Sequence, residues 1–225
     1  MFKREHHQKV LGILRKMNRD FLQDAKCYFG GGTAIALLHG EYRESIDIDF
    51  LCADQDGYRK LRSSVFDKGL GDIFSEPIEL MRDVRADRDG IRTVIAASGT
   101  PIKFEIVREA RIELSGTTVP SLPVPCLTNT DLFAEKLLAN ADRYADKSAL
   151  SRDIIDLMMM ESKSGCIPKA AWDKAINAYG DSVRGAFEKS KDLLRSNPEY
   201  LRSCLTKMGI SEEVGKSLEK ALRPS

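Results

Sequence analysis

A glycine-rich turn and two nearby aspartates have the residue types and spacing for chemistry on phosphates. The turn is Gly30-Gly31-Gly32-Thr33, after Tyr28-Phe29, which is typical of the end of a buried strand. Glycines let the backbone turn tightly and leave amide N–H groups uncovered for an anion. The apolar run after Thr33 predicts a short helix, whose N-terminal dipole and the Thr33 hydroxyl would act on the same anion. Gly31, Gly32 and Thr33 are therefore predicted to hold a triphosphate.

The two aspartates, Asp47 and Asp49, lie in the alternating segment Ile46–Phe50. Strict alternation predicts a half-buried strand, with Ile46, Ile48 and Phe50 in the core and both carboxylates on the other face. Residues two apart on a strand are separated by roughly 6.6 Å. Their carboxylates could therefore lean together over two Mg²⁺ ions about 3.5 to 4 Å apart.

A third carboxylate, Glu105, lies in the segment 102–107, which alternates in the same way. Three acidic groups around Mg²⁺ suit in-line attack of a hydroxyl on the α-phosphate of a nucleoside triphosphate (NTP), because the metal ions lower the pKa of the nucleophile and screen the charge of the leaving pyrophosphate. The predicted chemistry is nucleotidyl transfer, with Asp47, Asp49 and Glu105 as metal ligands and Glu105 helping to deprotonate the acceptor.

Other readings of the motifs fail on spacing. The dinucleotide fingerprint needs glycine at Ile35, an EF-hand loop starting at Asp47 needs Asp or Asn at Leu51, and no P-loop motif is present. Three histidines and five scattered cysteines match no usual zinc spacing.

Composition is typical of a compact intracellular enzyme. The chain has 225 residues, is 42% hydrophobic and carries a net charge of +1, so its charge does not predict nucleic-acid binding. The arginines at 82, 85, 88 and 92 alternate with aspartates, which favours a solvated hairpin over an RNA-binding strip. An odd number of cysteines, a charged N-terminus and no apolar run of ~18 residues predict a cytoplasmic protein without membrane segments.

The order of elements predicts an α+β fold, with a mixed sheet flanked by helices and then an α-helical lobe. An amphipathic helix through Val10 and Phe21 comes first, and hairpin turns at Asp89-Gly90 and Ser98-Gly99 separate strand-like stretches. Prolines between 116 and 125 predict an edge strand or a linker. We expect a catalytic domain over 1–125 and a helical domain over 126–225.

Ionisable residues recur in the helical half. Lys136 lies one turn into a helix predicted over 132–144, and Arg152, Asp153 and Asp156 lie on the next. Asp153 and Asp156 share a face and either hold Lys136 and Arg143 in position or form surface ion pairs.

These motifs resemble a known family. Gly-Gly-Thr, the stretch Arg43-x-Ser45-x-Asp47-x-Asp49-Phe50 and the later Lys…Arg…Arg-Asp-x-x-Asp-Leu pattern are similar to the AbiEii/AbiGii toxins, a group of DNA-polymerase-beta-like nucleotidyltransferases that includes the MenT toxins. The resemblance covers roughly residues 25 to 160. It implies the nucleotidyltransferase fold, nucleotide-binding roles for Arg43, Ser45 and Lys136, and contact of Lys136 with the phosphates.

The resemblance also implies a biological setting. The acceptor would be an RNA end, plausibly the tRNA 3′ end, and the protein would be the toxin of a bacterial toxin–antitoxin or abortive-infection pair, with a cognate antitoxin encoded nearby. Two alternatives stay open: transfer of a nucleotidyl or phosphoryl group to a protein hydroxyl, and a non-catalytic nucleotide- or RNA-binding regulator of the same fold. Three gathered carboxylates disfavour the regulator, because like charges repel.

Overall fold

The computed structural model describes residues 2–222, which form two compact units. The sheet unit contains the residues up to 34 and residues 45–128, and the helical unit contains residues 35–44 and those from 129 onward. The third crossing between the units, at 128/129, lies three residues after the predicted boundary at 125/126, and the segment 35–44 also belongs to the helical unit.

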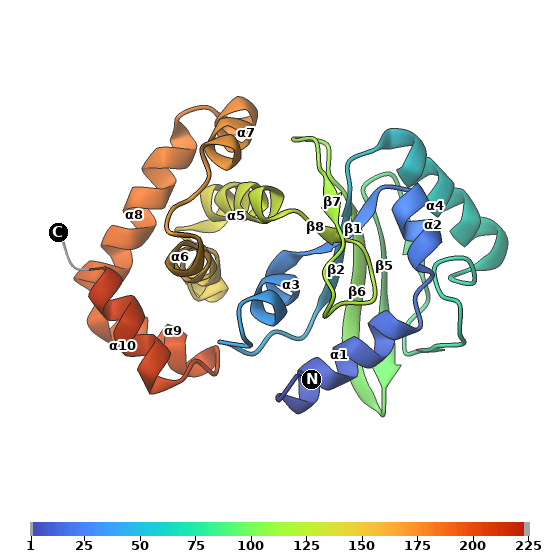
Figure 1. The fold of residues 1–225 in the computed structure, drawn as a ribbon, viewed down its shortest axis with the longest axis horizontal. Coiled ribbons are helices and arrows are strands. Elements are labelled where there is room, and N and C mark those ends of the chain that lie inside the picture. Colours follow the sequence, from blue (N-terminus) through green and yellow to red (C-terminus); the bar gives the residue numbers. More distant parts are fainter. Residues whose placement is uncertain (1, 223–225) are drawn as a thin grey trace. The chain divides into compact units, whose positions relative to one another are not determined.

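One mixed sheet of eight strands organises the sheet unit (Figure 1). Its strands run in the order β3-β5-β6-β2-β1-β8-β7, and β4 pairs with β5. The β2–β6 and β1–β8 pairs are parallel and the others antiparallel, so the mixed sheet predicted from the sequence is confirmed. The strands are β1 (Cys27–Gly30), β2 (Ile48–Cys52), β3 (Glu79–Leu80), β4 (Arg85–Ala86), β5 (Gly90–Ala97), β6 (Thr100–Arg108), β7 (Gly116–Thr117) and β8 (Cys126–Leu127).

Helices α1 (Glu5–Arg15), α2 (Arg19–Asp24) and α4 (Gln55–Lys68) pack against this sheet, with α2 and α4 on the same side in Figure 1. The single first helix predicted through Phe21 was wrong. The chain breaks between α1 and α2 because Asn18 is extended and its side chain accepts a hydrogen bond from the Phe21 amide, which caps α2. The core against the helices contains the rings of Phe29, Phe50, Phe104 and Phe74, with successive centroids 5.4 to 6.2 Å apart.

The strand predicted over Ile46–Phe50 begins two residues later, at Ile48. Ile48 and Phe50 are buried as expected, but Ile46 is 46% exposed, so its predicted place in the core was wrong. The sequence alternates apolar and polar residues from Ile46 onward, but the backbone before Ile48 pairs with no strand. Ile46 therefore lies outside the sheet.

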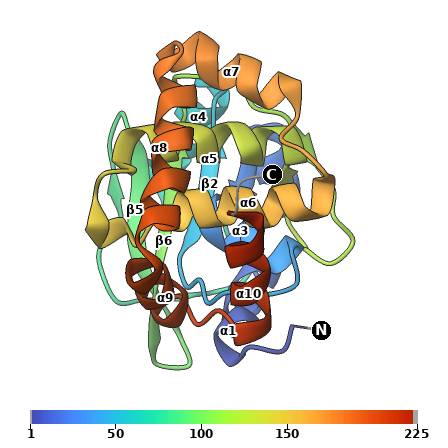
Figure 2. The same ribbon diagram turned by 90° about the vertical axis from the view of Figure 1, so that its left-hand side faces the viewer.

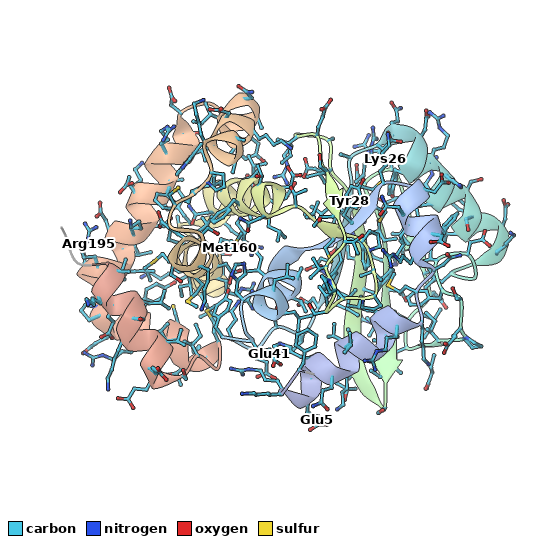
Figure 3. All side chains as sticks on the ribbon, in the orientation of Figure 1. Glu5, Lys26, Tyr28, Glu41, Met160 and Arg195 are labelled. Carbon is cyan, nitrogen blue, oxygen red and sulfur yellow. The ribbon has the colours of Figure 1, made fainter. Side chains whose placement is uncertain are left out.

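The helical unit is built around α5 (Asn129–Arg143), which contacts α6 (Arg152–Ser164), α7 (Lys169–Tyr179) and α8 (Ser182–Ser196). Figure 2 shows α8 crossing α5 and α6. Pro198 starts α9 (Pro198–Lys207), and α10 (Glu212–Ala221) follows. Met158, Met159 and Met160 are buried, and Met160 lies among the helices in Figure 3. Helix α3 (Gly31–Leu38) starts in the sheet unit and ends in this one.

None of the helices within residues 2–222 has the length and apolarity needed to cross a bilayer.

Candidate active site

The register of the sheet aligns charged residues from neighbouring strands. Asp49 on β2 opposes Glu105 on β6, and Glu105 opposes Arg92 on β5. Directly opposed residues point to the same face of a sheet, so these three side chains share one face. Asp47 precedes β2 by one residue and is half-buried, as is Asp49. Two of the three predicted carboxylates are thus neighbours across a strand pair, and the third is two residues away along the chain.

Glu105 is bound by two cations. Arg92 Nε donates to Glu105 Oε1 at 2.5 Å, and Lys103 Nζ lies 2.7 Å from Oε2. Burial would raise the pKa of Glu105, but the hydrogen bonds and charges of Lys103 and Arg92 outweigh it, so the pKa lies below its ordinary value. With a lowered pKa, Glu105 is ionised at neutral pH and accepts a proton poorly in this arrangement.

Lys103 links the three carboxylates electrostatically. Burial lowers its pKa, but the hydrogen bond to Glu105 and the charges of Glu105, Asp49 and Asp47 outweigh burial and raise the pKa above its ordinary value. A raised lysine pKa indicates a negative local field. The same field would attract a metal ion.

The glycine turn comes close to Asp49. Gly30 opposes Asp49 in the β1–β2 pair, and Gly31 follows in the left-handed region at φ 67°. A Cβ on Gly31 would lie 2.6 Å from Asp49 Oδ2, so a larger residue would clash with the carboxylate. Helix α3 starts at Gly31, and the first N–H groups of a helix have no partner within it. The turn thus brings a helix N-terminus beside an aspartate.

Thr33 and Ser45 contact each other. Thr33 is buried, and its hydroxyl donates to Ser45 Oγ at 2.9 Å. The Ser45 amide donates to Nε2 of the buried His7 at 3.3 Å. These bonds tie the start of α3 to the segment before β2. The Thr33 hydroxyl therefore donates inside the protein, which leaves the backbone amides of the turn as the candidate anion-binding groups.

The donor set fits a hard divalent cation, because carboxylate oxygens are the ligands that Mg²⁺ prefers. Asp47 and Asp49 are half-buried on one segment beside the glycine turn. Within residues 2–222, however, no three His, Cys, Asp or Glu side chains are gathered as a metal site. Glu105 is held instead by Lys103 and Arg92, so it would have to exchange these partners to become a metal ligand.

The helical unit holds a second charged cluster, centred on Asp156. Asp156 is fully buried and accepts two hydrogen bonds from Arg43, from Nε at 2.7 Å and from Nη2 at 3.0 Å. The Tyr42 hydroxyl also donates to it, and Lys136 Nζ lies 2.8 Å from its second oxygen. Burial would raise the pKa of Asp156, but Arg43 and Lys136 outweigh it and lower the pKa. The carboxylate is therefore ionised.

Lys136 connects Asp156 to Asp153. Its Nζ donates to Asp153 Oδ1 at 2.8 Å, and Arg143 donates to both oxygens of Asp153 at 2.6 and 2.9 Å. Burial would lower the pKa of Lys136, but Asp153 and Asp156 outweigh it and raise the pKa. Lys136 is only 6% exposed and Arg43 only 3%. The two cations predicted to bind nucleotide are thus paired inside the helical unit. Arg152 is exposed and donates from Nε to the Ala149 carbonyl at 3.1 Å.

Arg92 was missed by the sequence analysis, which placed it on a solvated hairpin surface. The interleaved aspartates suggested charge pairing within the hairpin, and Arg92 does lie 3.3 Å from Asp87. The informative signal was the two-residue turn at Ser98-Gly99. Both residues have positive φ, as type I′ hairpin turns require, and the sixth residues on either side of the turn are Arg92 and Glu105, which pair.

Comparisons with known proteins show the family of this chain. Residues 13–219 match the model of the nucleotidyl transferase AbiEii toxin family, of type IV toxin–antitoxin systems. A crystal structure of an antigenic nucleotidyltransferase-like protein from Paracoccidioides brasiliensis is 17% identical, covers 91% of this chain and 94% of its own, and has a TM-score of 0.50. The protein JHP933 from Helicobacter pylori is 16% identical, covers 88% and 99%, and has a TM-score of 0.38. No curated protein matches the sequence significantly.

Proposed function

Because the chain belongs to the AbiEii family of nucleotidyl transferase toxins and is thus a transferase enzyme, we propose that it moves a nucleoside monophosphate from an NTP to the hydroxyl of an RNA end in a Mg²⁺-dependent reaction. The tRNA 3′ end is the proposed acceptor. As a family of type IV toxin–antitoxin systems, AbiEii implies an antitoxin partner.

The observation that supports this proposal most is the set of groups around Asp49. Glu105 opposes it on the neighbouring strand, Asp47 is two residues away, and the glycine turn that starts α3 lies against its carboxylate. Metal-binding carboxylates beside a phosphate-binding turn are what transfer from a triphosphate requires. A protein that only binds nucleotide has no need of three carboxylates in one region.

In the proposed mechanism, Asp47 and Asp49 would hold Mg²⁺, joined by Glu105 once it has exchanged its partners. The bound ion would lower the pKa of the acceptor hydroxyl and neutralise charge on the triphosphate. The chain's own groups bind and orient the substrate. The amides of Gly31 and Gly32 would donate to phosphate oxygens at the helix N-terminus. Lys103 and Arg92, released from Glu105, would stabilise negative charge on the substrate.

The test is transfer of label from each α-labelled NTP, with Mg²⁺ and total bacterial RNA, by the wild type and by Asp47→Asn/Asp49→Asn. We expect labelled RNA with the wild type and a loss of at least ~100-fold in the variant. Lys169→Gln, at an exposed helical site, is the control. Label on protein alone would redirect the proposal to a protein hydroxyl as acceptor, and no label from any NTP would contradict it.

A further inference from the structure

A pocket lined by four arginines lies in the sheet unit, apart from the carboxylates. Its lining residues are Gln55, Tyr58, Arg59, Arg62, Arg88 and Arg108, and its volume is about 90 Å³. No acidic side chain lines it. A water molecule occupies about 30 Å³ in the liquid, so the pocket has room for a group the size of a phosphate.

Three elements position these side chains. Gln55, Tyr58, Arg59 and Arg62 recur at helical spacing on one face of α4. Arg88 lies at the tip of the β4–β5 hairpin, where Asp87 Oδ1 accepts from the amides of Asp89 and Gly90 and fixes the turn. Arg108 is the last residue of β6.

The walls of the pocket are tied together. The Tyr58 hydroxyl donates to the Asp87 carbonyl at 2.8 Å, which joins α4 to the hairpin, and the Arg108 amide donates to the Asp89 carbonyl at 3.1 Å, which joins the hairpin to the end of β6. A cation cluster on three fixed elements is a preformed site, and binding there orders little additional backbone.

The arginines have weak competition from carboxylates. Within residues 2–222, neither Arg62 nor Arg108 has a carboxylate within 4 Å. Arg59 pairs with Asp56 and Arg88 with Asp89, but all four side chains are at least 65% exposed, and such surface pairs contribute little. A guanidinium binds phosphate through two parallel N–H groups. A phosphate in the pocket could therefore accept hydrogen bonds from arginine N–H groups that no carboxylate holds tightly.

We propose that this pocket binds a backbone phosphate of the RNA acceptor, at a distance from the reacting end. The inference rests on the proposed function for the identity of the polyanion. Arg108 opposes Cys52, three residues beyond the Asp49–Glu105 pair and thus about 10 Å further along the strands. By strand alternation it lies on the other face of the sheet from Glu105. The pocket therefore contacts the body of the acceptor and not the hydroxyl that reacts.

The test measures binding and not transfer, so it is independent of catalysis. A fluorescein-labelled tRNA transcript is titrated by anisotropy over a series of KCl concentrations with the wild type, Arg62→Gln/Arg108→Gln, and the matched control Arg15→Gln/Arg82→Gln. The control removes the same charge from exposed positions of the sheet unit outside the pocket. We expect the pocket variant to bind about tenfold more weakly at 100 mM KCl, with the salt slope reduced by about 1, and the control to stay within twofold of the wild type.

The conservative variant Arg62→Lys/Arg108→Lys keeps the positive charge but removes the guanidinium groups that can donate two parallel hydrogen bonds to one phosphate. We expect it to keep the salt slope and to lose part of the affinity. Equal binding by the pocket variant and the wild type, or equal losses in the pocket variant and the control, would overturn the proposal.

Free phosphate is the other source of the same chemistry. A rise in melting temperature with 10 mM inorganic phosphate in the wild type but not in the pocket variant, with unchanged tRNA binding, would assign the pocket to the free anion and overturn the RNA proposal. If no NTP is transferred and tRNA binding still falls in the pocket variant, the proposed function fails and the pocket assignment stands.

Discussion

Arg92 on β5 and Glu105 on β6 face each other across two antiparallel strands, and the guanidinium Nε donates to the carboxylate at 2.5 Å. Lys103 binds the other oxygen. The predicted metal ligand therefore has two cationic partners, and binding of a metal ion by Glu105 competes with both.

Removing Arg92 should shift the pH dependence of transfer. In Arg92→Gln, Glu105 loses one of the cations that lower its pKa, so the pKa rises toward its ordinary value of about 4.3. If the reaction needs ionised Glu105, the acid limb of the kcat/KM profile moves to higher pH. Arg85→Gln, one strand further from Glu105, is the control. An acid limb that stays in place in Arg92→Gln would separate Glu105 from the reaction.

Glu105 should stabilise the folded chain in a pH-dependent way. A carboxyl whose pKa is lower in the folded than in the unfolded state contributes stability above the unfolded pKa and loses it as pH falls through the folded pKa. In metal-free buffer we expect Glu105→Gln to unfold about 1 kcal/mol more easily at pH 7, with the difference closing below about pH 4.3. Urea titrations of both proteins at pH 7, 5 and 3.5 measure it. A difference independent of pH would rule out the ion pairs as its source.

Lys136→Met should destabilise the protein by about 3 to 5 kcal/mol, because it leaves Asp153 and Asp156 buried with one cation fewer. The matched control is Lys169→Met, where an 87% exposed side chain pairs with Asp173 and the loss should stay below about 1 kcal/mol. Urea unfolding measures both. A stable Lys136→Met that loses only NTP-induced thermal protection would instead favour direct contact of Lys136 with the phosphates.

Gly31→Ala should lower both stability and transfer. Gly31 has φ 67°, and its added Cβ would lie 2.6 Å from Asp49 Oδ2, so we expect a loss of more than about 1 kcal/mol and displacement of the carboxylate. Gly12→Ala is the opposite control, because nothing lies within 4 Å of its added Cβ in the interior of α1. That change should stabilise by about 0.5 to 1 kcal/mol. Equal effects of the two changes would show that the turn is not constrained by Asp49.

The sequence predicted those parts of the fold that depend on local pattern. Alternation located the strands around Asp49 and Glu105, the Ser98-Gly99 turn located the hairpin, and prolines marked the sheet edge at β7. The predicted first helix was wrong at Phe21, because the side chain of Asn18 caps a new helix there despite the apolar spacing. The predicted burial of Ile46 was wrong because the alternating sequence pattern begins two residues before the strand does.

The tertiary partners of the candidate site residues could not be predicted from their neighbours in the sequence. Arg43 and Lys136 have side chains suited to phosphate, and only tertiary packing shows that Asp156 contacts both. A long cationic side chain has the same sequence signature in solvent, beside a ligand or in a buried ion pair. Their predicted nucleotide-binding roles stay predictions, as do the metal-binding roles of Asp47, Asp49 and Glu105.

The assignment of residues 35–44 to the helical unit has a consequence for synthesis of the chain on the ribosome. Arg43 is synthesised 113 residues before its partner Asp156. At about 5 to 20 residues per second, synthesis of the intervening chain takes roughly 6 to 23 s, during which the guanidinium has no Asp156 to pair with. A gene cut at residue 126 would therefore deliver a helical fragment with Asp156 but without Arg43, the arginine that neutralises it.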